Sequence, residues 1–313
     1  MVIIKCMGRI GNQMFHYAVY VALRRHRNDV YLDLSRYASD NERRFELEEV
    51  FGVKPRIYKK PAALRWMESC VSLLSRKGER NRVLARFAAL LKRIYGRVEF
   101  SYYRQYTHID DNSFRDLSSL ASVKNLILEG YWQSSAYFSC CYQELRKAYS
   151  FIDFCDTQTT ELVSEIRSCV SVSINFRRGD YYSNEEYRKI WGDICTIEYY
   201  RKAIAYMDEH LSFPEYYVIT DDPDWARGLS LIKNMRNAKI VSRHSANDWR
   251  DMILMSQCRH NIIANSSYSW WASWLNENPD KIVVAPSRWV QESSQAAAKL
   301  KRIHEENWIL IDP

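Results

Sequence analysis

Five short apolar segments in the second half of the chain alternate with amphipathic stretches, and this alternation constrains the fold most strongly. Two of the stretches, TIEYYRKAIAYMDEH and NDWRDMILMSQC, carry apolar residues at helical spacing. Short strands that alternate with helices are typical of a doubly wound parallel sheet. We therefore expect an α/β fold, with strands at residues 170–175, 216–220, 239–241, 261–264 and 282–285.

Polar residues follow three of these predicted strands. They are Arg177 and Arg178 after the first strand, Asp221 and Asp222 after the second, and Asn265, Ser266 and Ser267 after the fourth. In an open parallel sheet, ligands bind beyond the carboxyl ends of the strands. The sequence therefore predicts a single binding crevice at this edge of the sheet.

The arginine pair indicates a phosphate-bearing ligand. A guanidinium binds phosphate oxygens through two N–H groups and stays charged at physiological pH. The structural alternative is a salt bridge from Arg177 or Arg178 to Asp180, or contact with a helix end.

The acids and serines each allow two interpretations. The carboxylate of Asp221 or Asp222 can accept hydrogen bonds from the two adjacent N–H groups of guanine, or it can cap the helix that begins near Pro223. Ser266 and Ser267 can bind phosphate at a helix N-terminus or cap that helix. The chain has no DxD motif and no cluster of His and carboxylates at ligand spacing, so we expect no metal.

The N-terminal half predicts a smaller version of the same architecture. A strand at residues 2–5, a helix at 12–26 and a strand at 30–33 imply a parallel crossover. The glycines of GRIGNQ, residues 8–13, let a ligand approach the backbone and the start of the helix. Because 313 residues exceed what one core usually serves, we expect two domains, at residues 1–150 and 151–313.

Charge and cysteine usage suggest partners and location. Residues 54–97 contain thirteen Lys and Arg against two Glu, and two of their stretches have helical apolar spacing. These basic helices can be solvated and packed on a domain, or they can bind anionic lipid or a lipid-linked acceptor. Nucleic acid is a third interpretation, but no helix-turn-helix, RNP or zinc-finger pattern supports it.

Eight cysteines without a CxxC pair, and no signal-peptide core, predict a cytoplasmic protein, with peripheral membrane contact under the lipid interpretation.

The motifs together resemble glycosyltransferase family 11, the bacterial-type α-1,2-fucosyltransferases. The resemblance covers nearly the whole chain, in the same order, through GRIGNQMFHYA (8–18), EGYWQSSAYF (129–138), VSINFRRGDY (172–181), YYRKAI (199–204), ITDD (219–222) and DMILMSQCRHNIIANSSYSWWASWLN (251–276). It implies a GT-B fold of two facing Rossmann-like domains with largely parallel sheets. It also implies metal-independent, inverting transfer of L-fucose from GDP-β-L-fucose to the 2-hydroxyl of a galactose-type acceptor in a surface glycan precursor.

The resemblance also implies roles for individual residues. Arg177, Asp180 and Asn12 are the expected catalytic residues, and the expected donor-binding residues are Arg9, Asn175, Arg178, Asp221, Asp222, Ser266, Ser267 and Tyr268. In this scheme Arg177 grips the donor diphosphate, and Arg9 and Asn12 face the reacting sugar from the other domain.

The chain departs from the family at Asn175, where the family usually has His. Asn can bind ribose or phosphate, but it cannot act as a base near neutral pH. Asp180 is then the expected proton acceptor, unless a loose transition state needs little help from a base. The departure leaves open a non-catalytic protein that binds a GDP-sugar or glycan. A transferase of the same fold that uses another GDP-sugar is a separate alternative.

Overall fold

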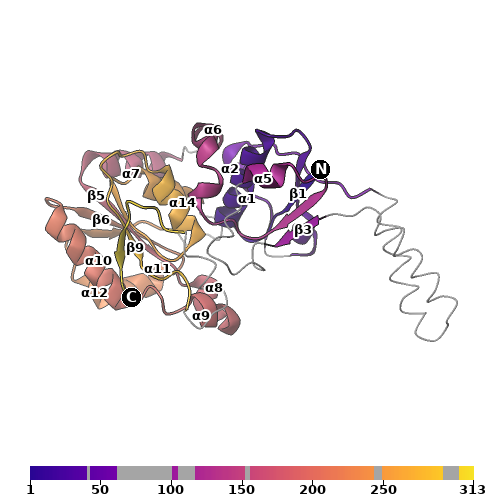
Figure 1. Cartoon of the computed structure of the whole chain (residues 1–313). Helices are drawn as coiled ribbons and strands as arrows, with labels where there is room; N and C mark the ends of the chain where they lie inside the picture. Colours follow the sequence, from indigo (N-terminus) through magenta and orange to yellow (C-terminus); the bar gives the residue numbers. More distant parts are fainter. Residues whose placement is uncertain (41–42, 62–100, 105–116, 152–155, 243–248, 292–302) are drawn as a thin grey trace, which may run out of the picture.

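The computed structural model describes residues 1–40, 43–61, 101–104, 117–151, 156–242, 249–291 and 303–313. It contains two parallel sheets, one between residues 2 and 129 and the other between residues 171 and 311, and helices pack around both (Figure 1). The basic helices predicted within residues 54–97 lie mostly outside the described residues, so their interpretation stays open.

The described N-terminal sheet has the strand order β2-β1-β4-β3, with parallel pairings. Its strands are β1 (Val2–Lys5), β2 (Val30–Asp33), β3 (Ser101–Arg104) and β4 (Leu126–Glu129). The helix α1 (Ile10–Arg24) connects β1 to β2, which confirms the predicted parallel crossover. The shorter helices are η1 (Ser35–Ser39), α2 (Leu47–Phe51) and α5 (Leu117–Ala121).

The described C-terminal sheet has the order β10-β9-β8-β5-β6-β7, also with parallel pairings. Its strands are β5 (Ser171–Phe176), β6 (Glu215–Thr220), β7 (Ala238–Ile240), β8 (His260–Ile262), β9 (Val283–Pro286) and β10 (Ile309–Ile311). The chain winds outward from β5 through β6 to β7 and then crosses back to place β8 on the other side of β5. This order confirms the predicted doubly wound sheet and puts its topological switch point between β5 and β8.

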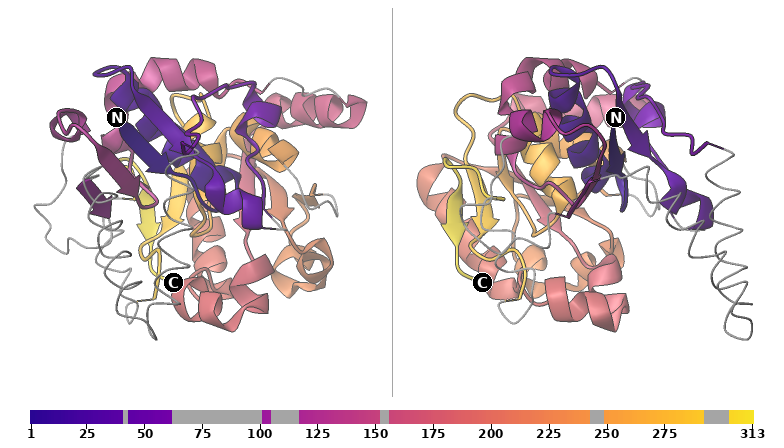
Figure 2. Two further views of the ribbon diagram at one scale, coloured as in Figure 1. Left: turned by 90° about the vertical axis from the view of Figure 1, so that its right-hand side faces the viewer. Right: turned by 45° about the vertical axis from the view of Figure 1, so that its right-hand side comes forward.

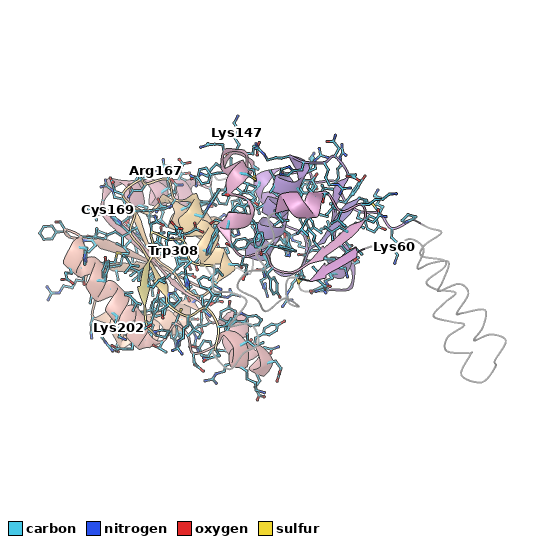
Figure 3. All side chains as sticks on the ribbon, viewed as in Figure 1. Lys60, Lys147, Arg167, Cys169, Lys202 and Trp308 are labelled. Carbon is cyan, nitrogen blue, oxygen red and sulfur yellow. The ribbon has the colours of Figure 1, made fainter. Side chains whose placement is uncertain are left out.

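Helices cover both faces of the C-terminal sheet. One face carries α10 (Ile197–His210), α11 (Pro223–Gly228) and α12 (Ser230–Lys233), and the other carries α7 (Thr157–Ser168), α13 (Trp249–Gln257) and α14 (Ser267–Leu275). In β6, Tyr216 and Val218 belong to the first core whereas Tyr217 and Ile219 belong to the second, because side chains alternate across a strand. Figure 3 shows Trp308 inside this unit, and it belongs to the second core.

The second core continues into the N-terminal unit, where α1 packs on α14 (Figure 2). The ring of Phe15 lies 4.7 Å from the rings of both Trp270 and Trp271, measured between centroids. The indole N–H of Trp271 donates a hydrogen bond of 2.9 Å to the Gly11 carbonyl oxygen. A Cβ on Gly11 would lie only 2.7 Å from the carbonyl carbon of Ser267, so the close approach requires glycine. The start of α1 is therefore fixed against the start of α14.

The two units are joined by η2 (Ser135–Tyr137), η3 (Ser139–Cys141) and α6 (Tyr142–Ala148). Two α/β units, each with a parallel sheet, meet along one interface, and this arrangement agrees with the expected GT-B class. The predicted boundary near residue 150 falls between the two sheets, and it stays a prediction.

Candidate functional site

Two ion pairs lie beside each other at the ends of β5 and β6. Arg177 Nη1 lies 2.7 Å from Asp221 Oδ2, and Arg178 Nε lies 3.3 Å from Asp222 Oδ2. The backbone N–H of Arg178 also donates a hydrogen bond of 2.8 Å to Asp221 Oδ1. The structure therefore brings four predicted site residues together, and it pairs the arginines with the acids that follow β6.

The guanidinium of Arg178 is held between two aromatic rings. Its Cζ lies 4.7 Å from the ring centroid of Tyr182 and 4.2 Å from that of Trp225, and such cation–π contacts restrict the plane of the group. Asp222 engages Nε, and none of the described residues accepts a hydrogen bond from either Nη atom. The terminal edge of Arg178, with four N–H groups, therefore has the geometry to bind two phosphate oxygens.

Asp222 has a second role, because it caps α11. Its Oδ1 accepts a hydrogen bond of 3.1 Å from the backbone N–H of Trp225, which confirms the capping interpretation for this residue. Recognition of guanine by Asp221 or Asp222 stays a prediction. Asp180 lies in α8 (Gly179–Ser183), directly after the arginines, and its role as proton acceptor also stays a prediction.

Asn175 lies near the end of β5 and is 5% exposed. Its Nδ2 donates a hydrogen bond of 3.3 Å to the Ile219 carbonyl oxygen. The backbone carbonyl oxygen of Asn175 accepts a hydrogen bond of 2.8 Å from the Tyr200 hydroxyl. Its Oδ1 is buried and has no hydrogen-bond partner among the described residues. A buried acceptor without a partner is unfavourable, so this atom is suited to a donor group supplied by a ligand.

The start of α14 faces the same region of the switch point. Ser266 caps the helix, since its Oγ accepts a hydrogen bond of 3.3 Å from the Tyr268 N–H. The hydroxyl of Tyr181, four residues after Arg177, donates a hydrogen bond of 3.0 Å to the Asn265 carbonyl oxygen. The segment after β5 is thus tied to the segment after β8, and the N-cap interpretation of Ser266 is confirmed. Phosphate binding by Ser266, Ser267 or Tyr268 stays a prediction.

The N-terminal loop approaches from the other unit. Gly8 has a φ of 78°, a conformation that favours glycine, and Arg9 is exposed at the N-cap of α1. Asn12 is half-buried, and its Oδ1 accepts a hydrogen bond of 2.9 Å from Gln133 Nε2. Because Gly11 touches Ser267, this loop lies against the α14 start. The roles of Arg9 and Asn12 stay predictions.

Comparison with known proteins bears on what this arrangement does. The model of the glycosyl transferase family 11 matches residues 87–312, which is more than half of the chain. This chain belongs to glycosyltransferase family 11. The family assignment agrees with the resemblance drawn from the motifs.

Two relatives illustrate how much of this chain matches curated proteins. It is 35% identical to an α-1,2-colitosyltransferase of Escherichia coli over 52% of this chain and 55% of the relative. It is 23% identical to galactoside α-(1,2)-fucosyltransferase 1 of Saimiri boliviensis boliviensis over 48% of this chain and 43% of that protein. The chain thus spans about half the length of the curated relatives it matches. Among solved structures, fucosyltransferase NodZ from Bradyrhizobium aligns over 88% of this chain and 93% of its own, with 12% identity and a TM-score of 0.41.

One buried histidine lies within the N-terminal motif at residues 8–18. His16 is fully buried in α1, and its Nε2 lies 2.8 Å from the Gly130 carbonyl oxygen, to which the neutral ring donates. Burial lowers the pKa of His16 to about 4, so the ring is neutral at physiological pH. Its Nδ1 is buried and has no hydrogen-bond partner among the described residues.

The described residues contain no group of three or more His, Cys, Asp or Glu side chains that could hold a metal ion. Among the described residues, we find no helix with the length and hydrophobicity of a membrane-spanning segment. The absence of a metal requirement and the location of the protein stay predictions.

Proposed function

We propose that this family 11 protein transfers L-fucose from GDP-β-L-fucose to the 2-hydroxyl of a galactose-type acceptor, with inversion and without a metal. The observation that carries the proposal is the pair of arginines at the switch point, where the Arg178 guanidinium is held between two rings and its Asp222 contact uses only Nε. This is a preformed arrangement for the diphosphate of a nucleotide sugar.

The charge distribution suits the reaction. As the bond from fucose to GDP breaks, negative charge grows on the departing β-phosphate while the sugar becomes oxocarbenium-like. Arg177 and Arg178 stay charged at any physiological pH, so they stabilise this charge without a metal. The buried Oδ1 of Asn175 supplies an acceptor for a hydroxyl or N–H group of the nucleotide. Asp180, next to the arginines, is the proposed acceptor of the proton from the attacking hydroxyl.

The two units divide the substrates in this proposal. Residues 151–313 hold the donor, and residues 1–150 form the acceptor-side unit, with the acceptor between the two. The proposed acceptor is a galactose-containing precursor of a surface glycan. A lipid-linked precursor would agree with the basic segment at residues 54–97, whose contact with a membrane is part of the same proposal.

The decisive experiment measures GDP release from GDP-fucose with a panel of galactosides, with and without EDTA. Wild type should release GDP only when an acceptor is present, and EDTA should leave the rate unchanged. Arg178→Ala should lower kcat/KM about a hundredfold, or about 2.7 kcal/mol. Arg201→Ala is the matched control, because Arg201 is a 60% exposed arginine on α10 that pairs only with its helix neighbour Glu198 among the described residues. Full activity of Arg178→Ala, or loss of activity in EDTA, would refute the proposal.

A second donor is favoured by the 35% identity to a colitosyltransferase. Colitose is fucose without its 3-hydroxyl, so a pocket for one sugar differs from a pocket for the other by a single polar contact. Competition between GDP-fucose and GDP-colitose in one reaction separates the two candidates. A site that hydrogen-bonds the 3-hydroxyl would discriminate strongly against the deoxy sugar. Tight binding of either donor without transfer to any acceptor would instead support a non-catalytic binding protein.

A further inference from the structure

A row of aromatic side chains extends from Arg177 towards the N-terminal unit. Tyr181 lies beside the Arg177 guanidinium, with Cζ 5.6 Å from its ring centroid. Trp191 stacks on Tyr181 at 6.0 Å between centroids and an interplanar angle of 19°. Tyr187 then meets Trp191 edge-on at 5.3 Å. Tyr187 and Trp191 belong to α9 (Glu185–Trp191), which follows α8 (Figure 1).

The N-terminal unit meets the other end of this row. Arg43 Nη2 lies 3.5 Å from the Tyr187 hydroxyl oxygen. Tyr131 follows β4 at the carboxyl edge of the N-terminal sheet and is half-buried. Burial raises the pKa of its phenol, and the neighbouring phenol of Tyr187 raises it further. Three segments that are distant in the sequence therefore converge on one place between the two units.

The aromatic row and the acid pairs lie on different sides of β5. In the sheet, β5 has β6 on one side and β8 on the other. Asp221 and Asp222 hold the arginines from the β6 side, whereas Tyr181 is bonded to Asn265, which follows β8. If the arginines bind the diphosphate, the nucleoside can bind on the β6 side. The aromatic row then lies on the β8 side, where the transferred sugar would meet its acceptor.

We propose that Tyr131, Tyr187 and Trp191, together with Arg43, form the subsite that binds the galactose ring of the acceptor. The proposal rests on the proposed function and adds the residues that recognise the second substrate. A galactose ring has one face made largely of C–H groups, which packs on flat aromatic rings, and a rim of hydroxyls. The phenols of Tyr131 and Tyr187 both donate and accept hydrogen bonds, and the Arg43 guanidinium donates them. This chemistry suits a neutral sugar.

The test compares steady-state kinetics of wild type, Tyr187→Ala and Tyr131→Ala, with lactose as acceptor and GDP-fucose as donor. Each substitution should raise the acceptor KM about tenfold and change the donor KM by less than about twofold. Phe213→Ala is the control, because Phe213 is an aromatic residue that is 94% exposed, and both KM values should stay at wild type there. A rise in donor KM alone, or no change in either constant, overturns the proposal.

If Tyr187→Ala does not fold, two gentler variants decide. Tyr187→Phe keeps the ring and removes only the hydroxyl near Arg43, and Arg43→Gln removes the guanidinium. Each should raise the acceptor KM about threefold, the size of one hydrogen bond. Wild-type acceptor KM in both variants overturns the proposal.

Failure of the proposed function would look different, because wild type would then transfer fucose to no galactoside. Saturation-transfer NMR with lactose in the presence of GDP tests the subsite without turnover. A lactose signal in wild type that disappears in Tyr187→Ala supports the subsite. A signal absent from wild type, or equal in both proteins, overturns it.

Discussion

Replacement of Gly179 by Ala tests whether the arginine site depends on exact placement of Asp221. Gly179 is the first residue of α8 and is exposed. A Cβ added there would lie 2.5 Å from Asp221 Oδ2 and 3.7 Å from Arg177 Cζ. Ordinary van der Waals contact begins at about 3.4 Å, so the carboxylate must retreat by about 0.9 Å. That movement disturbs the contacts of Asp221 with both the Arg177 side chain and the Arg178 N–H.

The expected loss is large in rate and small in stability. A misplacement of about 1 Å in a group that positions the reacting atoms can reduce the rate about a hundredfold, equivalent to about 2.7 kcal/mol. The free energy of unfolding should change by less than about 1 kcal/mol, because an exposed Gly-to-Ala change in a helix is itself favourable by a similar amount. We therefore expect Gly179→Ala to lower kcat/KM for fucosyl transfer about a hundredfold while Tm stays close to wild type.

The assay is GDP release with a galactoside acceptor, combined with thermal unfolding. Gly228→Ala is the matched control, because a Cβ at Gly228 meets no atom within 4 Å. Its kcat/KM should stay at wild type, and its Tm should rise only by the small gain that alanine gives in an exposed helix position. The clash also predicts that Gly179→Ala has little further effect in an Asp221→Ala background, where the opposing carboxylate is gone. Wild-type kcat/KM in Gly179→Ala, or a full hundredfold loss on top of Asp221→Ala, would refute the reasoning.

Three further predictions concern the junction, a buried histidine and the family departure. Gly11→Ala should lower the free energy of unfolding by about 2 kcal/mol in denaturant titrations, because its Cβ would overlap the Ser267 backbone; unchanged stability would contradict the packing. Because the pKa of His16 is about 4 in the folded protein and 6.5 for an unperturbed imidazole, the unfolded chain binds more protons between these values, and stability should fall by ~3 kcal/mol as pH drops through this window. Between pH 4 and pH 7, the free energy of unfolding should depend less on pH in His16→Gln than in wild type, whereas the exposed control His26→Gln should match wild type. The same pH dependence in His16→Gln and in wild type would contradict the lowered pKa of His16. Asn175→His should leave kcat at pH 7 within about threefold of wild type if this position supplies no base, whereas a gain of a hundredfold would show that Asn175 impairs the chain.

Much of the sheet architecture could be predicted because its central strands are short apolar runs between polar breaks. The expected strands at residues 2–5 and 30–33 coincide with β1 and β2, and the expected strand at residues 216–220 falls within β6. The prediction missed β3 and β10, which are two of the four strands at the ends of the sheet orders, although it found the other two, β2 and β7. An edge strand is covered less completely, so its pattern is weaker, as the half-exposed residues of β10 show.

The site could be predicted only where its residues are adjacent to strand ends. Arg177, Asp221 and Ser266 follow predicted strands, and the doubly wound topology brings those ends to one edge. The convergence of Arg43 with Tyr187 joins positions 144 residues apart, and no local pattern connects them. The same holds for the contact of Gly11 with Ser267, which depends on how α1 packs against α14 rather than on either motif alone.

The register of β5 against β6 explains why the two arginines lie beside the two acids. Phe176 lies opposite Thr220, so the next two residues of each strand end side by side, and basic and acidic residues meet one to one. Each guanidinium is thereby balanced by one carboxylate. Binding of a diphosphate therefore depends more on the orientation of the guanidinium groups than on the net charge of these four residues. A carboxylate that holds a guanidinium by one edge fixes the direction of the other edge. The acids at this site therefore act first as positioning groups for the arginines, which is why a methyl group on a neighbouring glycine can reach the chemistry without touching the substrate.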